Sequence, residues 1–383
     1  MSALNPNPGS DTNNQFIVGD SVLTLVEPAA LAPTLDGLLH AAKHRIHAEF
    51  YILRNDPVGI RFVRLCVDKA RAGVQVTLIR DNVGSFREPW PLQGEMDLAG
   101  VRYIDYNPIW PPHRWWHKVP PTHRNHRKIL VIDDELSLIS TGNVGREYTD
   151  LPVPDPHWDL SVVIRGPLTA ELVRVAQESQ RTILRDRRPD PLPEHEPMHN
   201  GRVLADIHDA WGRGEAHYIL QWYLRAIEQA RDHILIANPY FLPHRYLRRA
   251  LMQAARRGVR VELILPQMTD WPAVRHAMQH LYRAFLAAGV EIHEVQHQIV
   301  HAKAFTVDGC LSSLGSFNFD RWSVQDNLEA NLVVEDAAFT HRLNELIHQQ
   351  KARAVQLSYP LWAQRSRWSR LISWIWWRLR AGL

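Results

Sequence analysis

The sequence is poor in cysteine and carries no recognisable export signal. Cys66 and Cys310 are the only cysteines among 383 residues, too few for a disulfide framework or for a zinc site made of cysteines alone. The polar N-terminus, residues 1–15, has neither the basic region nor the apolar region of a signal peptide. Both absences favour a protein of the reducing cell interior over a secreted one.

Lysine is scarce as well, with 6 lysines beside 38 arginines. A lysine at a suggestive position is therefore informative. Acidic residues are missing from residues 351–383, which hold seven basic residues. Because the whole chain has a formal charge of +3, residues 1–350 carry about −4. A slightly acidic body disfavours the basic groove that a nucleic-acid-binding protein needs.

The overall composition is that of an ordinary globular protein. Hydrophobic residues make up 45% and charged residues 22% of the chain, which excludes wholesale disorder, a collagen and a long coiled coil. A length of 383 residues exceeds the roughly 100–200 residues of one domain. We therefore expect two domains.

The second half of the chain repeats the first. The repeated segments combine strand-like alternation with helix-like stretches, and they occur in the same order in both halves. The paired segments are residues 73–79 with 258–264, residues 98–103 with 287–292, and residues 126–133 with 301–308. Strands that alternate with helices predict an α/β fold, here a duplication of one α/β unit.

A stretch rich in proline and charge separates the two copies. Residues 185–197 lack apolar periodicity, which is typical of a linker. The predicted organisation is a polar tail at 1–15, a first domain at 16–188, a linker at 189–200, a second domain at 201–350 and a basic, tryptophan-rich segment at 351–383.

Each copy contains a histidine and a lysine that share one face of a strand. Side chains two residues apart in a strand project to the same side, so His126 lies beside Lys128, and His301 beside Lys303. An imidazole next to an ammonium group is a poor core pair and a good phosphate site. Two of the six lysines occupy these positions, which indicates a functional pair rather than a solvated strand face.

Each of these strands ends in a turn, after which the chain returns to a small polar cluster. The turns lie at 133–134 and 308–309, and Asp-Gly at the second is a hairpin signal. The clusters are residues 140–143 and 315–318, and both end in asparagine. Their hydroxyl and amide groups can donate hydrogen bonds to phosphoryl oxygens.

The two motifs together resemble the double signature of the phospholipase D superfamily, His-x-Lys-x4-Asp-x6-Gly-Ser/Gly-x-Asn. The first copy departs from it, because Ser140 and Thr141 stand where the family has Gly-Gly or Gly-Ser. The second copy fits throughout, with His301, Lys303, Asp308, Gly315, Ser316 and Asn318. Within the superfamily, residues 15–345 are most similar to the bacterial cardiolipin synthases that lack N-terminal transmembrane helices.

The resemblance implies an α/β fold of two duplicated phospholipase D-like domains. Each would be a mixed β-sheet flanked by helices, with one active site at the pseudo-twofold interface. By analogy with the family, His126 would be the nucleophile that forms a phosphohistidine, and His301 the acid and base. The residues alone leave these two roles interchangeable. The implied phosphate ligands are Lys128, Lys303, Thr141, Asn143, Ser316 and Asn318.

Four acidic residues accompany the motifs. Asp133 and Asp308 belong to the signature and so to the candidate catalytic set, but strand parity points them away from the His-Lys face and favours a turn or interdomain role. Asp159 and Glu329 stand at the same point of each copy. We expect them to orient the two histidines, in an order left open. As an alternative, they are ordinary surface acids at strand ends.

The phosphohistidine chemistry requires neither a metal nor a cofactor. Although the chain has 21 histidines, His113, His117 and His123 fall in a loop without acidic or cysteine partners at ligand spacing. We interpret them as scattered surface histidines.

The C-terminal segment combines basic residues with tryptophan. Its apolar run is far shorter than the ~20 residues of a membrane span. A helix here would carry Trp368, Leu371, Ile372, Ile375 and Leu379 on one stripe. Such a helix lies in the headgroup region of an anionic membrane or, alternatively, docks on the protein core. Tryptophans at positions 374, 376 and 377 lie off the stripe and favour lipid.

The leading functional hypothesis is phosphatidyl transfer. A phosphatidylglycerol-like donor would form phosphatidyl-histidine, and a lipid alcohol would accept the group to give cardiolipin. A hydrolytic phospholipase D would use water as the acceptor. A nuclease is disfavoured by the charge of the body, and an inactive binding module by the two intact His-Lys pairs. We expect peripheral association with the cytoplasmic face of the bacterial membrane, an anionic phospholipid substrate and no nucleic-acid partner.

Overall fold

The computed structural model describes residues 14–86, 88–109, 121–154, 156–184, 201–205 and 218–380. The predicted polar tail up to residue 13 and the predicted linker at 189–200 lie outside the described residues, as do His113 and His117.

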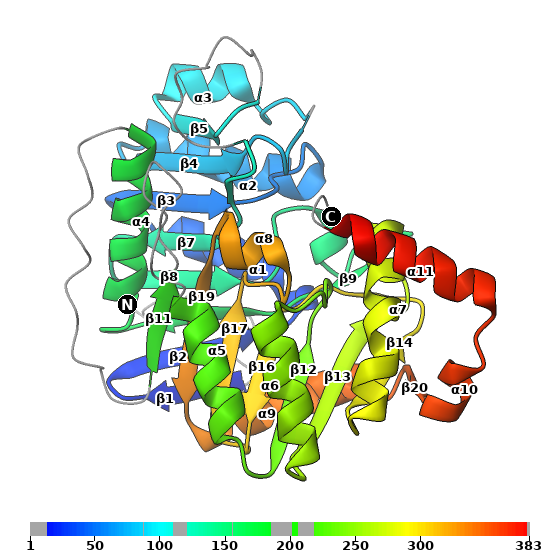
Figure 1. Ribbon diagram of the computed structural model, residues 1–383. Helices are drawn as coiled ribbons and strands as arrows, with labels where there is room; N and C mark the ends of the chain where they lie inside the picture. Colours follow the sequence, from blue (N-terminus) through cyan, green and yellow to red (C-terminus); the bar gives the residue numbers. More distant parts are fainter. Residues whose placement is uncertain are drawn as a thin grey trace.

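The first copy of the repeat forms an eight-stranded mixed sheet (Figure 1). Strands β3, β4 and β5 are parallel, and the remaining pairings are antiparallel. In order across the sheet, the strands are β1 (Gln15–Val18), β2 (Ser21–Val26), β10 (Ser161–Arg165), β8 (Leu136–Ser140), β7 (Ile129–Ile132), β3 (Arg45–Phe50), β4 (Gln75–Asp81) and β5 (Arg102–Tyr106).

The second copy forms a second eight-stranded sheet with the same central order. Its strands are β11 (Gly201–Ala205), β19 (Ala330–Glu335), β17 (Leu311–Gly315), β16 (Ala304–Val307), β12 (His233–Ala237), β13 (Arg260–Pro266), β14 (Glu291–Val295) and β20 (Ala354–Leu357). The series β10-β8-β7-β3-β4-β5 of the first sheet corresponds to β19-β17-β16-β12-β13-β14 of the second. The predicted duplicated α/β fold is confirmed.

Local signals that recur in both copies explain this agreement. Gly73 and Gly258 adopt φ values of 92° and 96°, which only glycine reaches without strain, and each follows a helix that leads into a strand. The hairpins β7-β8 and β16-β17 turn through two residues with positive φ, residues 133–134 and 308–309, as the tight hairpin turns of twisted strands require.

Helices cover the outer face of each sheet. Apolar clusters join α1 (Pro28–Ala41), α2 (Pro57–Arg71) and α3 (Gln93–Ala99) to the first sheet, and α5 (Tyr218–Gln229), α6 (Arg245–Arg256) and α7 (Pro272–Ala287) to the second. A third cluster contains side chains of α4 (Thr169–Leu184), α9 (Ala337–Lys351) and both sheets. The two copies therefore share one core at their interface.

Two short parallel ribbons also join the copies. Strand β6 (Arg124–Asn125) of the first copy pairs with β18 (Asn327–Leu328) of the second, and β9 (His157–Trp158) pairs with β15 (Ile299–Val300). Each ribbon directly precedes a motif histidine on one side and an acidic residue on the other. The interface thus places chemistry from both copies together.

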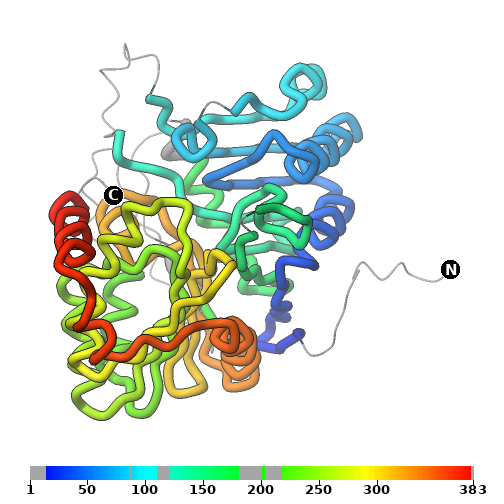
Figure 2. Tube along the Cα trace, turned by 90° about the vertical axis from the view of Figure 1, so that its right-hand side faces the viewer, coloured from blue at the N-terminus to red at the C-terminus, as the bar shows by residue number. Residues whose placement is uncertain are grey.

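The predicted C-terminal segment begins inside the fold. Strand β20 adds an edge strand to the second sheet, so residues 354–357 belong to the domain rather than to an appended tail. Helices α10 (Tyr359–Ala363) and α11 (Arg367–Leu379) follow, and α11 packs on α7. Figure 2 shows this segment lying along the second copy.

The signature aspartates lie in the hairpin turns, away from the motif histidines. The Asp133 carboxylate accepts the backbone N–H groups of residues 43, 44 and 45 at 2.7–2.8 Å, and Asp308 accepts those of residues 231, 232 and 233 at 2.9 Å. Seven residues of extended chain, roughly 20 Å, separate each aspartate from its motif histidine. The predicted turn role is confirmed, because each aspartate lies in a hairpin turn and its carboxylate binds the backbone of its own copy. The catalytic assignment and the alternative interdomain role are corrected.

We expect Asp308→Ala to lower the free energy of unfolding by about 2–4 kcal/mol. The substitution removes the acceptor of three backbone N–H groups and places alanine at a φ of 50°. Asp308→Asn, which keeps an accepting oxygen and tolerates this φ, should cost clearly less. Urea unfolding measures both variants. A variant that remained as stable as the parent but lost all turnover would contradict the structural role.

Candidate active site

The two ribbons bring His126 and His301 to the interface between the copies. The backbone N–H of His126 donates to Leu328 O at 3.0 Å, and that of His301 donates to Trp158 O at 3.0 Å. Both side chains are buried, with exposed fractions of 7% and 5%. The backbone of each copy therefore fixes the position of the other copy's histidine.

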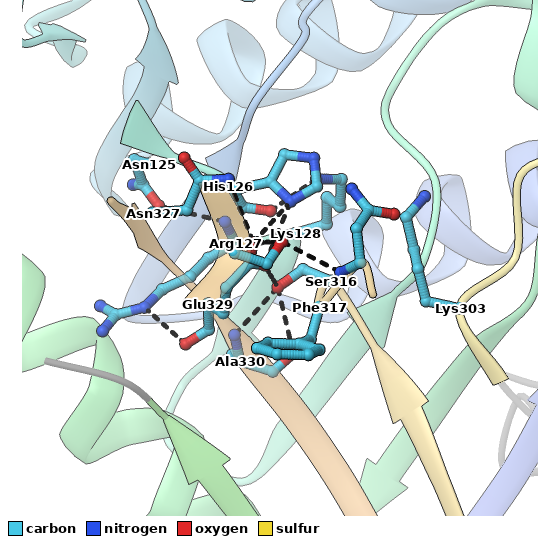
Figure 3. Close-up of polar contacts among 12 residues, drawn as sticks. Asn125, His126, Arg127, Lys128, Lys303, Ser316, Phe317, Asn327, Glu329 and Ala330 are labelled. Atoms are coloured by element: carbon cyan, nitrogen blue, oxygen red, sulfur yellow. Dashed lines mark hydrogen bonds and ion pairs between the residues drawn. The ribbon is translucent and has the colours of Figure 1, made fainter. Parts of the chain in front are cut away.

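His126 is held by a carboxylate from the second copy. Its Nδ1 lies 3.1 Å from both oxygens of Glu329, which is completely buried. Figure 3 shows Glu329 between His126 and Ser316. Ser323 and Asn327 also donate to this carboxylate, at 2.6 and 3.2 Å. A carboxylate bound in this way favours the proton of His126 on Nδ1 and leaves Nε2 unprotonated in the neutral ring.

His301 is held by a carboxylate from the first copy. Its Nδ1 lies 2.9 and 3.0 Å from the two oxygens of Asp159, which is also buried. The orienting order that the sequence left open is thus crossed, since each acidic residue serves the histidine of the other copy. Both acids are buried. The alternative that they are ordinary surface acids at strand ends is therefore wrong.

Lys128 and Lys303 lie beside the histidines and are almost completely buried. The Lys128 ammonium donates to His126 O, and the Lys303 ammonium to His301 O, each at 2.5 Å. Lys303 also reaches Thr141 O of the first copy at 3.1 Å. Burial lowers the pKa of both lysines, that of Lys303 to about 8, although Asp159 and Glu329 oppose the effect.

Burial lowers the pKa of both histidines to about 4, and it outweighs the carboxylate that each one contacts. The lysine of the opposite copy contributes to the lowering in both cases. For the two carboxylates the balance is reversed. Burial acts to raise the pKa of Asp159 and of Glu329, but the adjacent histidines oppose it, and the net result is that both pKa values are lowered. At neutral pH the site contains two neutral imidazoles, each against an ionised carboxylate.

The motif hydroxyls donate hydrogen bonds to the two orienting carboxylates. Thr141 Oγ1 donates to Asp159 at 2.6 Å and accepts Leu160 N–H at 3.0 Å. Ser316 Oγ donates to Glu329 and accepts Ala330 N–H at 2.9 Å. The prediction that Thr141 and Ser316 hold phosphoryl oxygens is corrected, because the single hydroxyl proton of each is already engaged. Threonine does in the first copy what serine does in the second.

Ser140, which departs from the signature, lies opposite a smaller residue on the neighbouring strand than Gly315 does in the second copy. In the second copy, a side chain at Gly315 would come within 2.3 Å of Ala330 O and 2.6 Å of Asn331 Cα. Ser140 instead faces the smaller Ser161, whose hydroxyl donates to it at 2.9 Å. The first copy therefore exchanges a glycine and an asparagine for two serines.

The motif asparagines lie in the same region. The Asn143 amide oxygen accepts the backbone N–H of Ile52 at 3.0 Å, and the Asn143 side chain also hydrogen-bonds to Tyr148. Asn318 is 3% exposed, and within the described part of the chain its amide oxygen has no hydrogen-bond partner. Both side chains are thus buried, and the Asn318 amide oxygen can accept a hydrogen bond from a ligand.

Several residues near the histidines were missed by the sequence reasoning. The ring of His157 stacks on His301 at a centroid distance of 5.1 Å, and burial lowers its pKa to about 4. Tyr51 contacts His126 edge-on at 5.0 Å, and Tyr148 lies 5.7 Å from His301. His157 stands two residues before an orienting acid, as Asn327 does in the second copy, and this shared spacing could have identified it.

One of the groups of possible metal ligands coincides with these residues. Donor atoms of His157, Asp159 and His301 lie within 4.8 Å of one another. Asp159 is already engaged by His301 and by Thr141, and Lys303 lies 3.0 Å from the His301 ring. A cation at this place would compete with an ammonium group, which makes the site unsuited to a resident metal.

Comparison with known families and proteins relates the chain to one group. Residues 223–351 match the family described as cardiolipin synthase, PLD-like domain. The chain is 30% identical to cardiolipin synthase B of Salmonella typhi over 85% of its own length and 79% of that protein. It is 31% identical to the cardiolipin synthase of Geobacillus kaustophilus over 85% of its length, and there it spans 65% of the relative.

Solved structures share the fold at low sequence identity. The phosphatidylserine synthase of Haemophilus influenzae superposes with a TM-score of 0.74 over 96% of both chains at 15% identity. A polyphosphate kinase of Porphyromonas gingivalis gives a TM-score of 0.58 at 14% identity, over 88% of this chain and 49% of that one. In the described residues, every helix is too short or too polar to cross a membrane.

Acidification is expected to destabilise the protein between about pH 6.5 and about pH 4. In this window the unfolded chain protonates His126 and His301 while the folded protein does not, so stability falls as the pH falls. Each histidine contributes up to about 3 kcal/mol. Urea unfolding across the window measures the loss. The double variant His126→Asn, His301→Asn should show a shallower dependence, and an equally steep one would contradict the assignment.

Proposed function

Because this chain belongs to the cardiolipin synthase family of phospholipase D-like proteins, we propose that it is a phosphatidyltransferase that makes cardiolipin. The donor would be phosphatidylglycerol or a similar anionic phospholipid, and the acceptor the hydroxyl group of a second lipid. The observation that carries the proposal is the crossed pairing of two buried imidazoles with two buried carboxylates, flanked by two lysines. This arrangement supplies a nucleophile, a proton carrier and cationic phosphate ligands at one place.

The first chemical step forms a covalent intermediate. His126 Nε2, neutral and oriented by Glu329, attacks the phosphorus atom of the donor. The bond from phosphorus to the leaving glycerol oxygen breaks, and His301 gives that oxygen a proton. The products of the step are phosphatidyl-His126 and free glycerol. The low pKa of His126 keeps its attacking nitrogen unprotonated at neutral pH.

The second step transfers the phosphatidyl group. His301, neutral after the first step, removes the proton from the acceptor hydroxyl, and the resulting alkoxide attacks phosphorus. The bond from phosphorus to His126 breaks, which restores both histidines to their starting states. Asp159 supports His301 in both directions, because an ionised carboxylate stabilises the imidazolium that forms in between.

The protonation of His301 depends on the substrate. Its pKa of about 4 leaves it neutral in the empty site. A phosphodiester brings a negative charge next to the imidazole, and an adjacent negative charge raises a histidine pKa. The same charge favours the ammonium forms of Lys128 and Lys303, which then stabilise the transition state. Substrate binding therefore completes the acid that the first step needs.

Peripheral membrane association at the cytoplasmic face belongs to the same proposal. Both substrates are lipids, so the enzyme must reach them in a membrane surface. The amphipathic helix α11 supports this, since its apolar stripe is exposed while its other side packs on α7.

Incubation with labelled phosphatidylglycerol vesicles tests the reaction. The proposal predicts labelled cardiolipin and release of free glycerol in equal amounts, because each transfer frees one leaving group. If phosphatidic acid were the sole lipid product, the protein would be a hydrolase and the transferase proposal would be wrong. The double variant His126→Asn, His301→Asn is the matched control and should form neither product.

A donor with a p-nitrophenolate leaving group separates the two histidines. This leaving group departs without a proton, so His301→Asn should still form the covalent adduct but should release it slowly, because the acceptor lacks its base. His126→Asn should form no adduct. Intact-protein mass spectrometry and peptide mapping detect the adduct and its position. An adduct on His301 in the His126→Asn variant would exchange the two roles, and its absence from both would contradict covalent catalysis.

A further inference from the structure

A groove on the second copy is lined by arginines and lies apart from the motif histidines. It has a volume of about 440 Å³ and is formed by α7, α10 and α11. Its charged lining consists of Arg283, Arg365, Arg367 and Arg370, and its described lining contains no carboxylate. Four guanidinium groups around one hollow form a site of positive potential, which fits an anionic ligand.

Within the described residues, the arginines of the groove form no salt bridge. Arg365 donates to three neutral oxygens, those of Gln279, Ser369 and Ser373, and it stacks on Trp362 at 4.2 Å. The other three arginines are exposed, and within the described part of the chain none of the three forms an ion pair. Arg365 is thus a fixed structural cation, while the other three have donors available for a ligand.

The groove borders the exposed apolar stripe of α11. The helix packs on α7 through the side that carries Ser373, Trp376 and Trp377. The stripe predicted from the sequence faces outward, with exposed fractions of 75% for Trp368, 42% for Leu371, 42% for Ile372, 40% for Ile375 and 57% for Leu379. Leu371 belongs to both surfaces, since it also lines the groove. A basic hollow and an apolar ridge therefore meet along one helix.

We propose that this groove is a second, non-catalytic lipid site that binds the phosphodiester headgroup of an anionic phospholipid in the membrane surface. The headgroup phosphate would contact Arg283, Arg367 and Arg370, and its acyl chains would run along the apolar stripe. Charge complementarity selects an anionic lipid over a zwitterionic one, and the stripe selects a lipid over free phosphate. This proposal depends on the proposed membrane association and not on the proposed reaction.

Helix α7 connects the groove to the rim of the active site. Asp270 accepts the Tyr240 hydroxyl at 2.5 Å, and the Tyr240 ring faces His301 at 6.4 Å. The next residue, Trp271, is 61% exposed, and α7 starts directly after it. The groove residues of α7, Gln279, His280 and Arg283, lie 7 to 11 positions after its first residue, Pro272, which is roughly 10–17 Å along the helix. A lipid held in the groove would thus dock the active-site rim on the same membrane leaflet.

The test compares a triple variant, Arg283→Gln, Arg367→Gln, Arg370→Gln, called the groove variant, with a charge-matched triple control. Arg365 is retained, because its hydrogen bonds hold α11 in place. The control removes three exposed arginines elsewhere, Arg64→Gln, Arg225→Gln, Arg256→Gln. Sedimentation is measured with phosphatidylcholine vesicles, with and without phosphatidylglycerol. An arginine near an anionic surface strengthens binding about fivefold, so the groove variant should lose about 100-fold in partitioning to anionic vesicles. The control should lose less than about threefold because of screening.

Two further measurements identify the ligand and separate this site from the reaction. Turnover of water-soluble short-chain phosphatidylglycerol should be the same in the groove variant and the parent, since this substrate needs no membrane. An inactive parent whose vesicle binding still depends on the groove would refute only the proposed reaction. Equal loss of binding in the groove and control variants would overturn the site. Calorimetric binding of inorganic phosphate as tight as that of the short-chain lipid would also overturn it, in favour of a free-phosphate site.

Discussion

The crossed contacts between imidazole and carboxylate are the constraint on which the site depends. His126 contacts Glu329 and His301 contacts Asp159, so each half of the duplicated chain supplies the partner of the other half's histidine. Neither copy alone contains a complete pair. The parallel ribbons β6-β18 and β9-β15 hold both pairs in register, and the apolar cluster shared by the two sheets holds the ribbons. The geometry of the site therefore depends directly on how the two copies pack against each other.

The crossed contacts also place each buried carboxylate next to hydrogen-bond donors and cationic groups. A buried carboxylate without such partners would destabilise the fold. An ionised carboxylate without water or a partner loses several kcal/mol of hydration. Glu329 and Asp159 receive hydrogen bonds from imidazole and hydroxyl groups, and the lysines lie near both acids. The site keeps its lysines and histidines ready for an anion, because burial disfavours their charged forms until a phosphate arrives.

Many features were predictable from short segments of sequence. The repeated glycines, the turns at 133–134 and 308–309 and the two His-x-Lys pairs act locally, and the structure has them where the patterns placed them. The errors concern side chains whose partners are distant in sequence. Thr141 and Ser316 were expected to hold phosphoryl oxygens but bind the orienting acids, because strands more than ten residues away bring those acids within 3 Å. Their hydroxyl groups alone could not reveal this choice.

The duplication, the α/β class, the motif residues and the apolar stripe near the C-terminus could be predicted, because each depends on spacing along one segment. Three features became visible only in the folded chain: the acids cross between the copies, Asp133 and Asp308 bind strands of their own copy, and α11 packs through its serine and tryptophan side and leaves the stripe exposed. Periodicity records which side chains share a face. What lies opposite that face depends on how the two sheets and their helices fill a common core.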